Sequence, residues 1–277
     1  MSAAKEDAVH DAGYKQSSDL EYGVRHHNNG FNHTQEGGSS LATKEGVMMP
    51  AFGGAFQPGP YQPSFRKFAN PAPLGLCAFA LTTFVLSLIN ANARGVSTPN
   101  IVVGMAYAYG GLVQLLAGMW EMAVGNTFGA TALSSYGGFW LSFAMIQTGS
   151  FGITAAYEED PEALMSALGF YLIAWWVFTT ILLFCTLKST LAFFSLFFFL
   201  DITFLLLAVA HFATVDGGIN VTINKVAGVF GLITAFIAWW NALAGIAETS
   251  NSFFTIPVVH FPWSEKVKAE RRASKSD

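Results

Sequence analysis

The amino-acid sequence predicts an all-α membrane protein with six transmembrane helices and both termini in the cytoplasm. Hydrophobic residues make up 52% of the 277-residue chain and charged residues 12%, which is about half the charged share of an ordinary soluble domain. Long charge-free runs separate the few charges, and a bilayer core needs about 20 apolar residues per helix. The runs are continuously apolar rather than alternating, which favours helices over a transmembrane barrel.

Composition divides the chain into three parts. Residues 1–69 contain no long apolar run and are rich in Gly, Ser, Asn and His, so we expect a disordered cytoplasmic tail. They show no positively charged segment followed by a short apolar one, so no cleaved signal peptide is expected. Residues 70–250 form the expected six-helix transmembrane domain, and residues 251–277 form a charged cytoplasmic tail.

The first three spans are expected at 71–92, 100–124 and 131–156. The first begins at "NPAPLGL", where an Asn can cap the helix and a Pro suits the first helical position. The turn "ANARGVSTPN" ends it, and "GNTFGAT" separates the second span from the third. Small residues are frequent in the second span, and they favour either tight packing within one subunit or an oligomer interface.

The last three spans are expected at 163–187, 189–213 and 225–247. The acidic turn "EEDPE" precedes the fourth span, "LKS" separates the fourth from the fifth, and "TVDGGIN" leads into the sixth. The sixth span is again rich in Gly and Ala, so the same two interpretations apply to it.

The orientation follows from lysine and arginine counts in the connecting segments. With six spans, one side carries most of these residues: Arg66, Lys67, Lys188, Lys266, Lys268, Arg271, Arg272 and Lys275. The opposite side carries Arg94, Lys225 and the acidic "EEDPE". The basic side is therefore predicted to be cytoplasmic.

Two helix N-termini on the cytoplasmic side are candidate substrate-binding positions. Asn70 and Pro71 begin the first span, and Asn126 and Thr127 precede the third. A helix N-terminus presents unpaired amides and the positive end of the helix dipole, which favour an anion. Plain helix capping is the alternative interpretation.

Phe79, Tyr136 and Leu200 are candidates for a narrow apolar constriction. Each lies on a span that enters from the cytoplasm, some five to eleven residues past the span's expected start. At about 1.5 Å per residue, they share a broad slab in the inner half of the bilayer. Ordinary core packing remains the alternative.

Carboxylates inside the apolar spans are candidates for proton coupling. Asp201 lies within "FFFLDITFLLL", and Glu121 lies near the cytoplasmic end of the second span. An intramembrane carboxylate is costly and indicates function unless it is a hydrogen-bonded tie between helices. His211, near the outer end of the fifth span, is a weaker candidate for a proton relay.

The sequence contains no constellation typical of a soluble enzyme. No nucleophile elbow, Walker loop or clustered Cys/His metal spacing is present, so neither catalysis, a cofactor nor a metal is expected. Cys77 and Cys185 both lie in apolar runs and are read as ordinary buried thiols. The net charge of −4 gives no indication of nucleic-acid binding.

Two stretches of the sequence carry a resemblance to a known family. They are "NPAPLGLCAF" (70–79) and "GMWEMAVGNTFGATALSSYGGFW" (118–140). Together they resemble the acetate uptake transporter family, the YaaH-type succinate–acetate permeases and their fungal relatives. The stretch "FGGAFQPG" (52–59) resembles a signature of the fungal branch, although its core departs from the common form.

The resemblance implies a multi-pass plasma-membrane protein that forms a homohexamer, with a pathway within each subunit. It implies transport of acetate and other short-chain monocarboxylates, coupled to protons as symport in fungal members. The expected partners are therefore small carboxylates, protons, the lipid bilayer and further copies of the chain. The family's hydrophobic constriction maps to Phe79 and Tyr136 by motif, and to Leu200 in the fifth span.

Two other functions remain open at this stage. One is a membrane sensor or regulator of the acetic acid response, or an exporter of ammonium, with the long N-terminal tail carrying signals. The other is a structural ring protein, which rests only on the small-residue faces. An intact constriction favours transport, because a sensor tolerates a blocked pathway and a permease does not.

Overall fold

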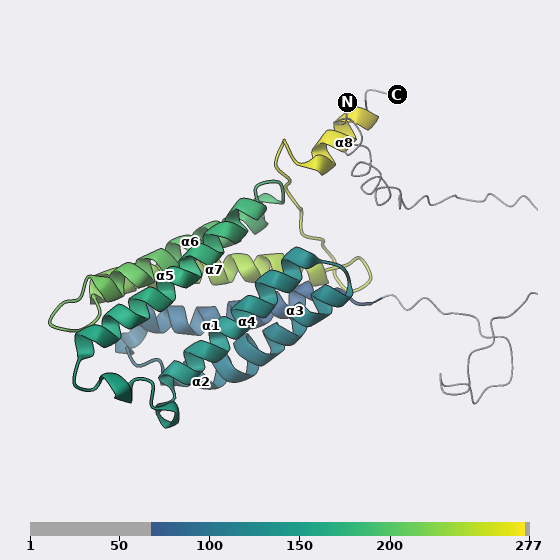
Figure 1. The fold of residues 1–277 in the computed structure, drawn as a ribbon. Helices are drawn as coiled ribbons and strands as arrows, with labels where there is room; N and C mark the ends of the chain where they lie inside the picture. Colours follow the sequence, from purple (N-terminus) through teal and green to yellow (C-terminus); the bar gives the residue numbers. More distant parts are fainter. Residues whose placement is uncertain (1–67, 275–277) are drawn as a thin grey trace, which may run out of the picture. The chain divides into compact units, whose positions relative to one another are not determined.

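The structure, a computed structural model, describes residues 68–274. The predicted N-terminal tail therefore lies almost wholly outside the described residues, as does the fungal-branch signature at 52–59. The described part is helical, with elements of these bounds: α1 Ala72–Asn90, α2 Asn100–Tyr107, α3 Gln114–Ala123, α4 Thr127–Gln147, α5 Pro161–Cys185, α6 Leu191–Phe212, α7 Val221–Ile246 and α8 Glu265–Ala273 (Figure 1).

Five helical segments are long and apolar enough to cross a bilayer: α1, the continuous segment Asn100–Ala123, α5, α6 and α7. Each overlaps a predicted span, although α5 begins two residues and α7 four residues before the span expected for it. The remaining long helix, α4, has 21 residues and runs alongside the others in the same bundle (Figure 1). Its Thr, Ser and Gly residues lower its hydropathy, so its crossing of the membrane stays a prediction.

The third predicted span is shifted relative to the structure. It was expected at 131–156, whereas α4 covers Thr127–Gln147. The early start follows from Asn126, whose side-chain Oδ1 accepts a hydrogen bond from the Gly129 amide at 3.0 Å. The early end follows from extended backbone at Thr148 and a positive φ of 67° at Gly152, after which residues 149–157 form only short 3-10 turns.

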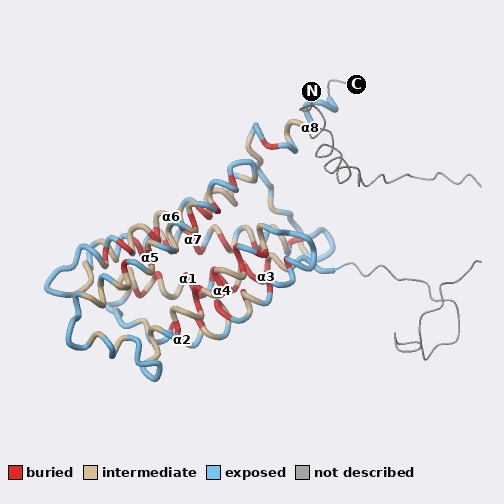
Figure 2. The backbone as a smooth tube through the Cα atoms, viewed as in Figure 1, coloured by how far each residue is buried: buried red, intermediate tan, exposed pale blue. Residues whose placement is uncertain are grey.

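The long helices alternate in direction and pack as a ring. In this ring α4 contacts α2 and α3, α3 contacts α1, α1 contacts α7, α7 contacts α6, and α6 contacts α5. Side chains close the ring between α4 and α5. Tyr136 Oη lies 3.0 Å from Thr179 Oγ1 and Ser142 Oγ lies 2.8 Å from Tyr171 Oη. The buried residues face the middle of this bundle (Figure 2).

A π-helical turn, Ala108–Val113, joins α2 to α3 within one continuous helical segment. Its two glycines permit close packing, since a Cβ on Gly110 would overlap Thr82 of α1 and a Cβ on Gly111 would overlap Leu141 of α4. Gly228 of α7 lies equally close to the α1 backbone. These small residues therefore pack within one subunit, whereas Gly104 has open space where its side chain would be.

The segment after α7 returns across the turn between α5 and α6. The Leu191 amide donates to the Val259 carbonyl at 2.8 Å, and Trp263 Nε1 donates to the Leu187 carbonyl at 2.7 Å. Helix α8 follows, with Ser264 as its N-cap. The expected charged tail is thus partly helical and is attached to the bundle.

Candidate functional site

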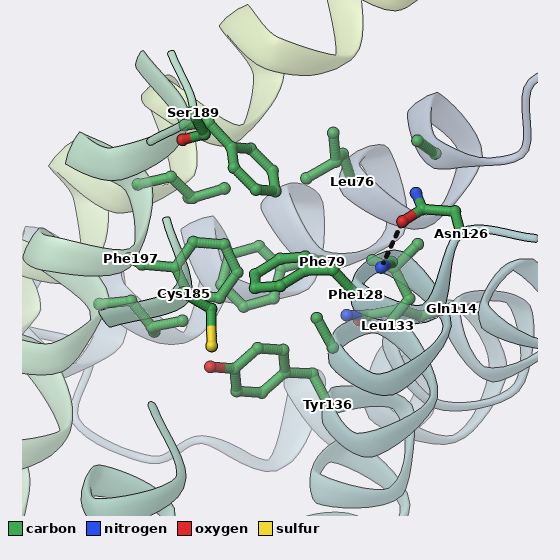
Figure 3. A pocket seen from close by; sticks show the side chains of 16 residues that line it. Leu76, Phe79, Gln114, Asn126, Phe128, Leu133, Tyr136, Cys185, Ser189 and Phe197 are labelled. Carbon is green, nitrogen blue, oxygen red and sulfur yellow. Dashed lines mark hydrogen bonds between the residues drawn. The ribbon is translucent and has the colours of Figure 1, made fainter. Parts of the chain in front are cut away.

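We call the end of the bundle where α1 and α4 begin the near end, and the opposite end the far end. A cavity of 390 Å³, the near cavity, opens at the near end among α1, α3, α4, α5 and α6 (Figure 3). Figure 3 shows Gln114 and Asn126 on one side of the hollow and Phe197 and Ser189 on the other. Its walls are mainly apolar.

All three predicted constriction residues line the near cavity. Phe79 from α1, Tyr136 from α4 and Leu200 from α6 are each at most 5% exposed. The rings of Phe79 and Tyr136 lie 5.8 Å apart between centroids. The hydrogen bond from Tyr136 to Thr179 fixes the Tyr136 ring across the space between α4 and α5. The structure thus brings together side chains that are 57 and 64 positions apart in sequence.

Asn126 and Gln114 supply polar groups to this apolar cavity. Asn126 caps α4 and also donates through Nδ2 to Glu121 Oε2. Gln114 is fully buried, and neither end of its amide finds a hydrogen-bond partner among the described residues. Sequence reasoning missed Gln114. The available signal was one polar residue inside the apolar run "GGLVQLLAGMW".

Glu121 lies just behind the near cavity. It is 1% exposed, and its Oε1 has no hydrogen-bond partner within residues 68–274. A Cβ on Gly129, which lines the near cavity, would come within 2.8 Å of Glu121 Oε2. The oxygen nearest the lining is thus the one bonded to Asn126, and Glu121 itself does not line the near cavity.

The other helix-terminus candidates lie apart from the near cavity. Asn70 accepts a hydrogen bond from the Ala72 amide at 3.1 Å, which satisfies one amide of the first turn of α1. Asn70 and Pro71 line a separate hollow that also contains Glu248. Thr127 is exposed, and its carbonyl accepts from Thr131 Oγ1. Of the four candidates, Asn126 lines the near cavity and the other three do not.

Asp201 faces α5 rather than the near cavity. Its carboxylate accepts hydrogen bonds from Trp176 Nε1 at 3.1 Å and from Thr180 Oγ1. Asp201 therefore ties α6 to α5, one residue after Leu200. This is the arrangement expected of the hydrogen-bonded tie that the sequence left open.

A second cavity of 190 Å³, the far cavity, lies at the far end. Leu200 lines the near cavity and Leu207 lines the far one, so two turns of α6, about 10 Å, separate their side chains. An aromatic layer lies between the two cavities. In it Phe204 stacks on Tyr136 at 6.4 Å and packs edge-on against Phe139 at 5.2 Å between centroids.

A ring of apolar helices with a cavity at each end and an aromatic layer between them defines a membrane transport protein for small solutes. The comparison with protein families agrees with this class. The chain belongs to the GPR1/FUN34/yaaH family, whose model matches residues 52–263.

Relatives within this family are similar along most of their length. The chain is 60% identical over 245 residues to Acetate permease A of Emericella nidulans, covering 86% of this chain and 82% of the relative. It is 54% identical over 220 residues to Ammonia transport outward protein 2 of Saccharomyces cerevisiae, covering 79% and 76%. A solved structure of the bacterial acetate channel SatP matches with a TM-score of 0.61 and 36% identity, covering 69% of this chain and 99% of that one.

Proposed function

We propose that the protein is a permease for acetate and related short-chain monocarboxylates, with the pathway running through the centre of each subunit. The observation that carries this proposal is the convergence of Phe79, Tyr136 and Leu200 on one cavity. The similarity to an acetate permease at 60% identity and to an acetate channel structure supports the choice of substrate.

The physical chemistry of the cavity suits a small acid with a methyl group. Apolar and aromatic walls favour transfer of the methyl group from water and disfavour a charged or strongly hydrated solute. The unpartnered amide of Gln114 and the side chain of Asn126 offer hydrogen bonds to a carboxyl group. The close packing of Phe79 on Tyr136 leaves little width for larger acids.

The proposed topology has six spans: the five apolar segments and, third along the chain, α4. Both termini then lie in the cytoplasm. A crossing by α4 is consistent with the alternation of helix directions in the bundle (Figure 1). The near end would be cytoplasmic, because Lys188 and the basic residues of α8 lie at that end. We place the protein in the plasma membrane, in line with the permease function.

We also propose that the subunit assembles as a homohexamer. An outward-facing strip of the second span contains Gly104 and Ala108, both exposed, between the exposed side chains of Ile101 and Leu112. Small residues of this kind allow a second helix to approach closely in a bilayer. Oligomer mass measured in mild detergent tests this part of the proposal.

Coupling to protons is the third part of the proposal. Glu121 is the better placed of the two predicted carboxylates, because it lies beside the near cavity with one oxygen unpaired. Asp201 has both carboxylate oxygens hydrogen-bonded to α5. We therefore assign Glu121 to proton exchange at the near end and Asp201 to positioning α6 against α5.

The test is uptake of labelled acetate by the purified protein in liposomes, with and without an inward proton gradient, against empty liposomes at matched pH. Accumulation driven by the gradient above the empty-liposome level is expected for a coupled permease. Rapid equilibration of acetate without accumulation driven by the gradient would indicate a channel and not a coupled carrier. No protein-dependent flux from folded protein would contradict transport of acetate.

A second candidate function is export of ammonium. It is favoured by the 54% identity to a protein named for outward ammonia transport. The same liposomes, loaded with labelled methylammonium, discriminate between the two functions. Protein-dependent efflux of methylammonium without acetate flux would favour this alternative.

A further inference from the structure

The far cavity exposes more polar surface than the near cavity, although apolar side chains form most of its wall. Five helices each contribute one polar side chain to its lining: Asn90, Gln147, Tyr171, His211 and Asn224. The rest of the lining includes Leu86, Phe139 and Leu207, so the polar groups surround a space that ends at the aromatic layer. Amide and imidazole groups in such a setting are suited to a small carboxyl-bearing solute.

His211 is the group in this cavity that can carry a proton near neutral pH. Its Nδ1 lies 2.8 Å from the Leu207 carbonyl, one turn earlier on α6. A carbonyl only accepts, so Nδ1 carries the hydrogen and donates it. In the neutral ring Nε2 then holds a lone pair, and no hydrogen bond to Nε2 is found within the described residues.

No fixed charge lines the far cavity among the described residues. Tyr171 from α5 is the other titratable side chain in the lining. The charged residues at the far ends of the surrounding elements are exposed and outside the lining: Arg94 after α1, Glu158, Glu159 and Asp160 before α5, Glu162 on α5, Asp216 after α6 and Lys225 on α7. Asp201 on α6 is partly buried, but it also lies outside the lining and is hydrogen-bonded to α5. The described lining from α1 and α4 contains no titratable group. A charge on His211 would therefore be the charge that a solute in the cavity meets.

We propose that the far cavity is a second binding site for the transported monocarboxylate and that His211 hands the solute its proton there. This inference rests on the proposed permease function. The imidazole takes up a proton at Nε2 from water on the far side and pairs with an entering carboxylate. The Nε2–H proton then passes to a carboxylate oxygen, leaving a neutral imidazole and a neutral carboxylic acid.

The surroundings of the pair favour this transfer. In water a carboxylic acid titrates about two pH units below an imidazole, so the ion pair is the stable form. Burial of charged groups changes protonation equilibria by up to about 3–5 units, and the neutral pair carries no charge to desolvate. The aromatic layer beside the cavity then receives a neutral acid, which crosses apolar surroundings far more readily than an anion.

The test is the pH profile of protein-dependent acetate uptake into liposomes, measured at fixed total acetate from pH 7.5 to 5.5. Proton transfer through His211 predicts that wild-type uptake rises as the pH falls and levels off once the imidazole is protonated. Undissociated acetic acid keeps increasing about tenfold per pH unit over this range, so uptake that required only the free acid would not level off.

The variant His211→Gln removes the titration and keeps a hydrogen-bonding side chain. It is expected to lose the plateau and to reduce uptake at pH 6 by about tenfold or more, as for loss of a proton-transferring group. His260→Gln, which removes an imidazole that lies outside both cavities, is the matched control and should retain the wild-type plateau.

An unchanged profile in His211→Gln would overturn the inference while leaving the permease function intact. Where the Gln variant does not elute from size exclusion as wild type does, His211→Asn replaces it. The wild-type pH profile tests the inference without any variant. If wild-type uptake rises in proportion to the concentration of undissociated acetic acid and shows no plateau, the inference is wrong. Absence of wild-type uptake above empty liposomes would overturn both the permease function and the inference.

Discussion

Gln114 is a buried side chain whose amide finds no hydrogen-bond partner among residues 68–274. Asp201, by contrast, is an intramembrane carboxylate whose two oxygens are both hydrogen-bonded. A buried polar group without a partner destabilises the fold, so its retention beside a cavity indicates a role toward the solute. For single buried residues in this protein, the hydrogen-bond partners are therefore a better guide to function than the charge.

Replacing Gln114 with Leu should stabilise the protein and impair transport. The change removes a buried amide without partners and keeps a similar volume, so we expect a gain of about 1–2 kcal/mol in unfolding free energy. Loss of the amide should lower acetate uptake several-fold. Unfolding in detergent and uptake in liposomes measure the two effects on the same preparation.

Thr83→Val is the matched control for that variant. The Thr83 hydroxyl is also buried without a partner in the described part of the chain, but Thr83 does not line the near cavity. Its replacement should leave uptake unchanged. Equal loss of uptake in both variants would show that Gln114 acts through packing and not through contact with the solute.

Phe79→Ala should widen the range of acids that pass. Removing the ring opens the contact with Tyr136, so uptake of lactate or succinate relative to acetate should rise about tenfold or more. The same change at Phe84, whose ring packs on Phe236 and Trp239, serves as control and should not alter selectivity. Because truncating a core Phe costs about 3–5 kcal/mol, both variants require proof of folding, and unchanged selectivity in folded Phe79→Ala would contradict the constriction.

The shared cavity position of Phe79 and Tyr136 could be predicted, because depth along a helix and the family motif both point to these residues. The partners of Asp201 could not be predicted, because Trp176 and Thr180 lie on another helix. Gln114 was missed although it is a single polar residue in an apolar run, and the preceding π-helical turn alters the helical register in this segment. Helical periodicity alone does not indicate such a turn.

At the level of helices, the bounds of α4 were the least well predicted, and both α4 and α7 begin four residues before their expected starts. Asn126 and Asn220 cap α4 and α7 as side chains of this type usually do. The end of α4 was placed nine residues too late, because apolar residues such as Phe151 and Ile153 continue past it. In the structure the extended backbone at Thr148 and the positive φ at Gly152 end the helix there. Apolar composition alone therefore overestimates the length of a span.

Asn126→Ala should destabilise the protein more than loss of an ordinary cap. The change removes the hydrogen bond to the Gly129 amide and also leaves Glu121 without its donor. We expect the unfolding free energy to fall by about 2–4 kcal/mol. Loss of the cap accounts for about 1 kcal/mol of this, and the buried carboxyl left without a donor accounts for the rest. Thermal unfolding in detergent measures it.

Asn220→Ala is the control for that comparison. Asn220 accepts from the Ile223 amide at 3.2 Å in the same capping position of α7, with no side-chain hydrogen bond to a carboxylate. The Asn220→Ala variant should lose only the capping hydrogen bond, which lowers the unfolding free energy by about 1 kcal/mol. Equal losses in the two variants would show that the contact between Asn126 and Glu121 adds nothing to stability.

For the whole molecule, the ring of helices explains why cavities lie near its centre. The backbones of α4 and α5 do not pack closely, and long side chains from Tyr136, Phe139 and Tyr171 fill the space between them. Hydropathy predicts where apolar helices lie but not which neighbours stand apart, because that depends on where Gly and aromatic residues face each other. The position of the cavities therefore required the structure.

The topology itself yields the last prediction, which decides whether α4 crosses the membrane. Six crossings place Arg94, Glu158 and Asp216 on the outer side and Lys266 on the inner side. In a background where the free thiols Cys77 and Cys185 are replaced by Ser, single Cys at Arg94, Glu158 or Asp216 should react with an impermeant maleimide in intact cells. Lys266→Cys should react only after permeabilisation. These four positions are exposed, so a lack of labelling reports the side of the membrane and not burial.

One labelling pattern would contradict six crossings. If Glu158→Cys is protected while Arg94→Cys reacts, α4 does not cross the membrane. The number of spans is then odd, and the two termini lie on opposite sides.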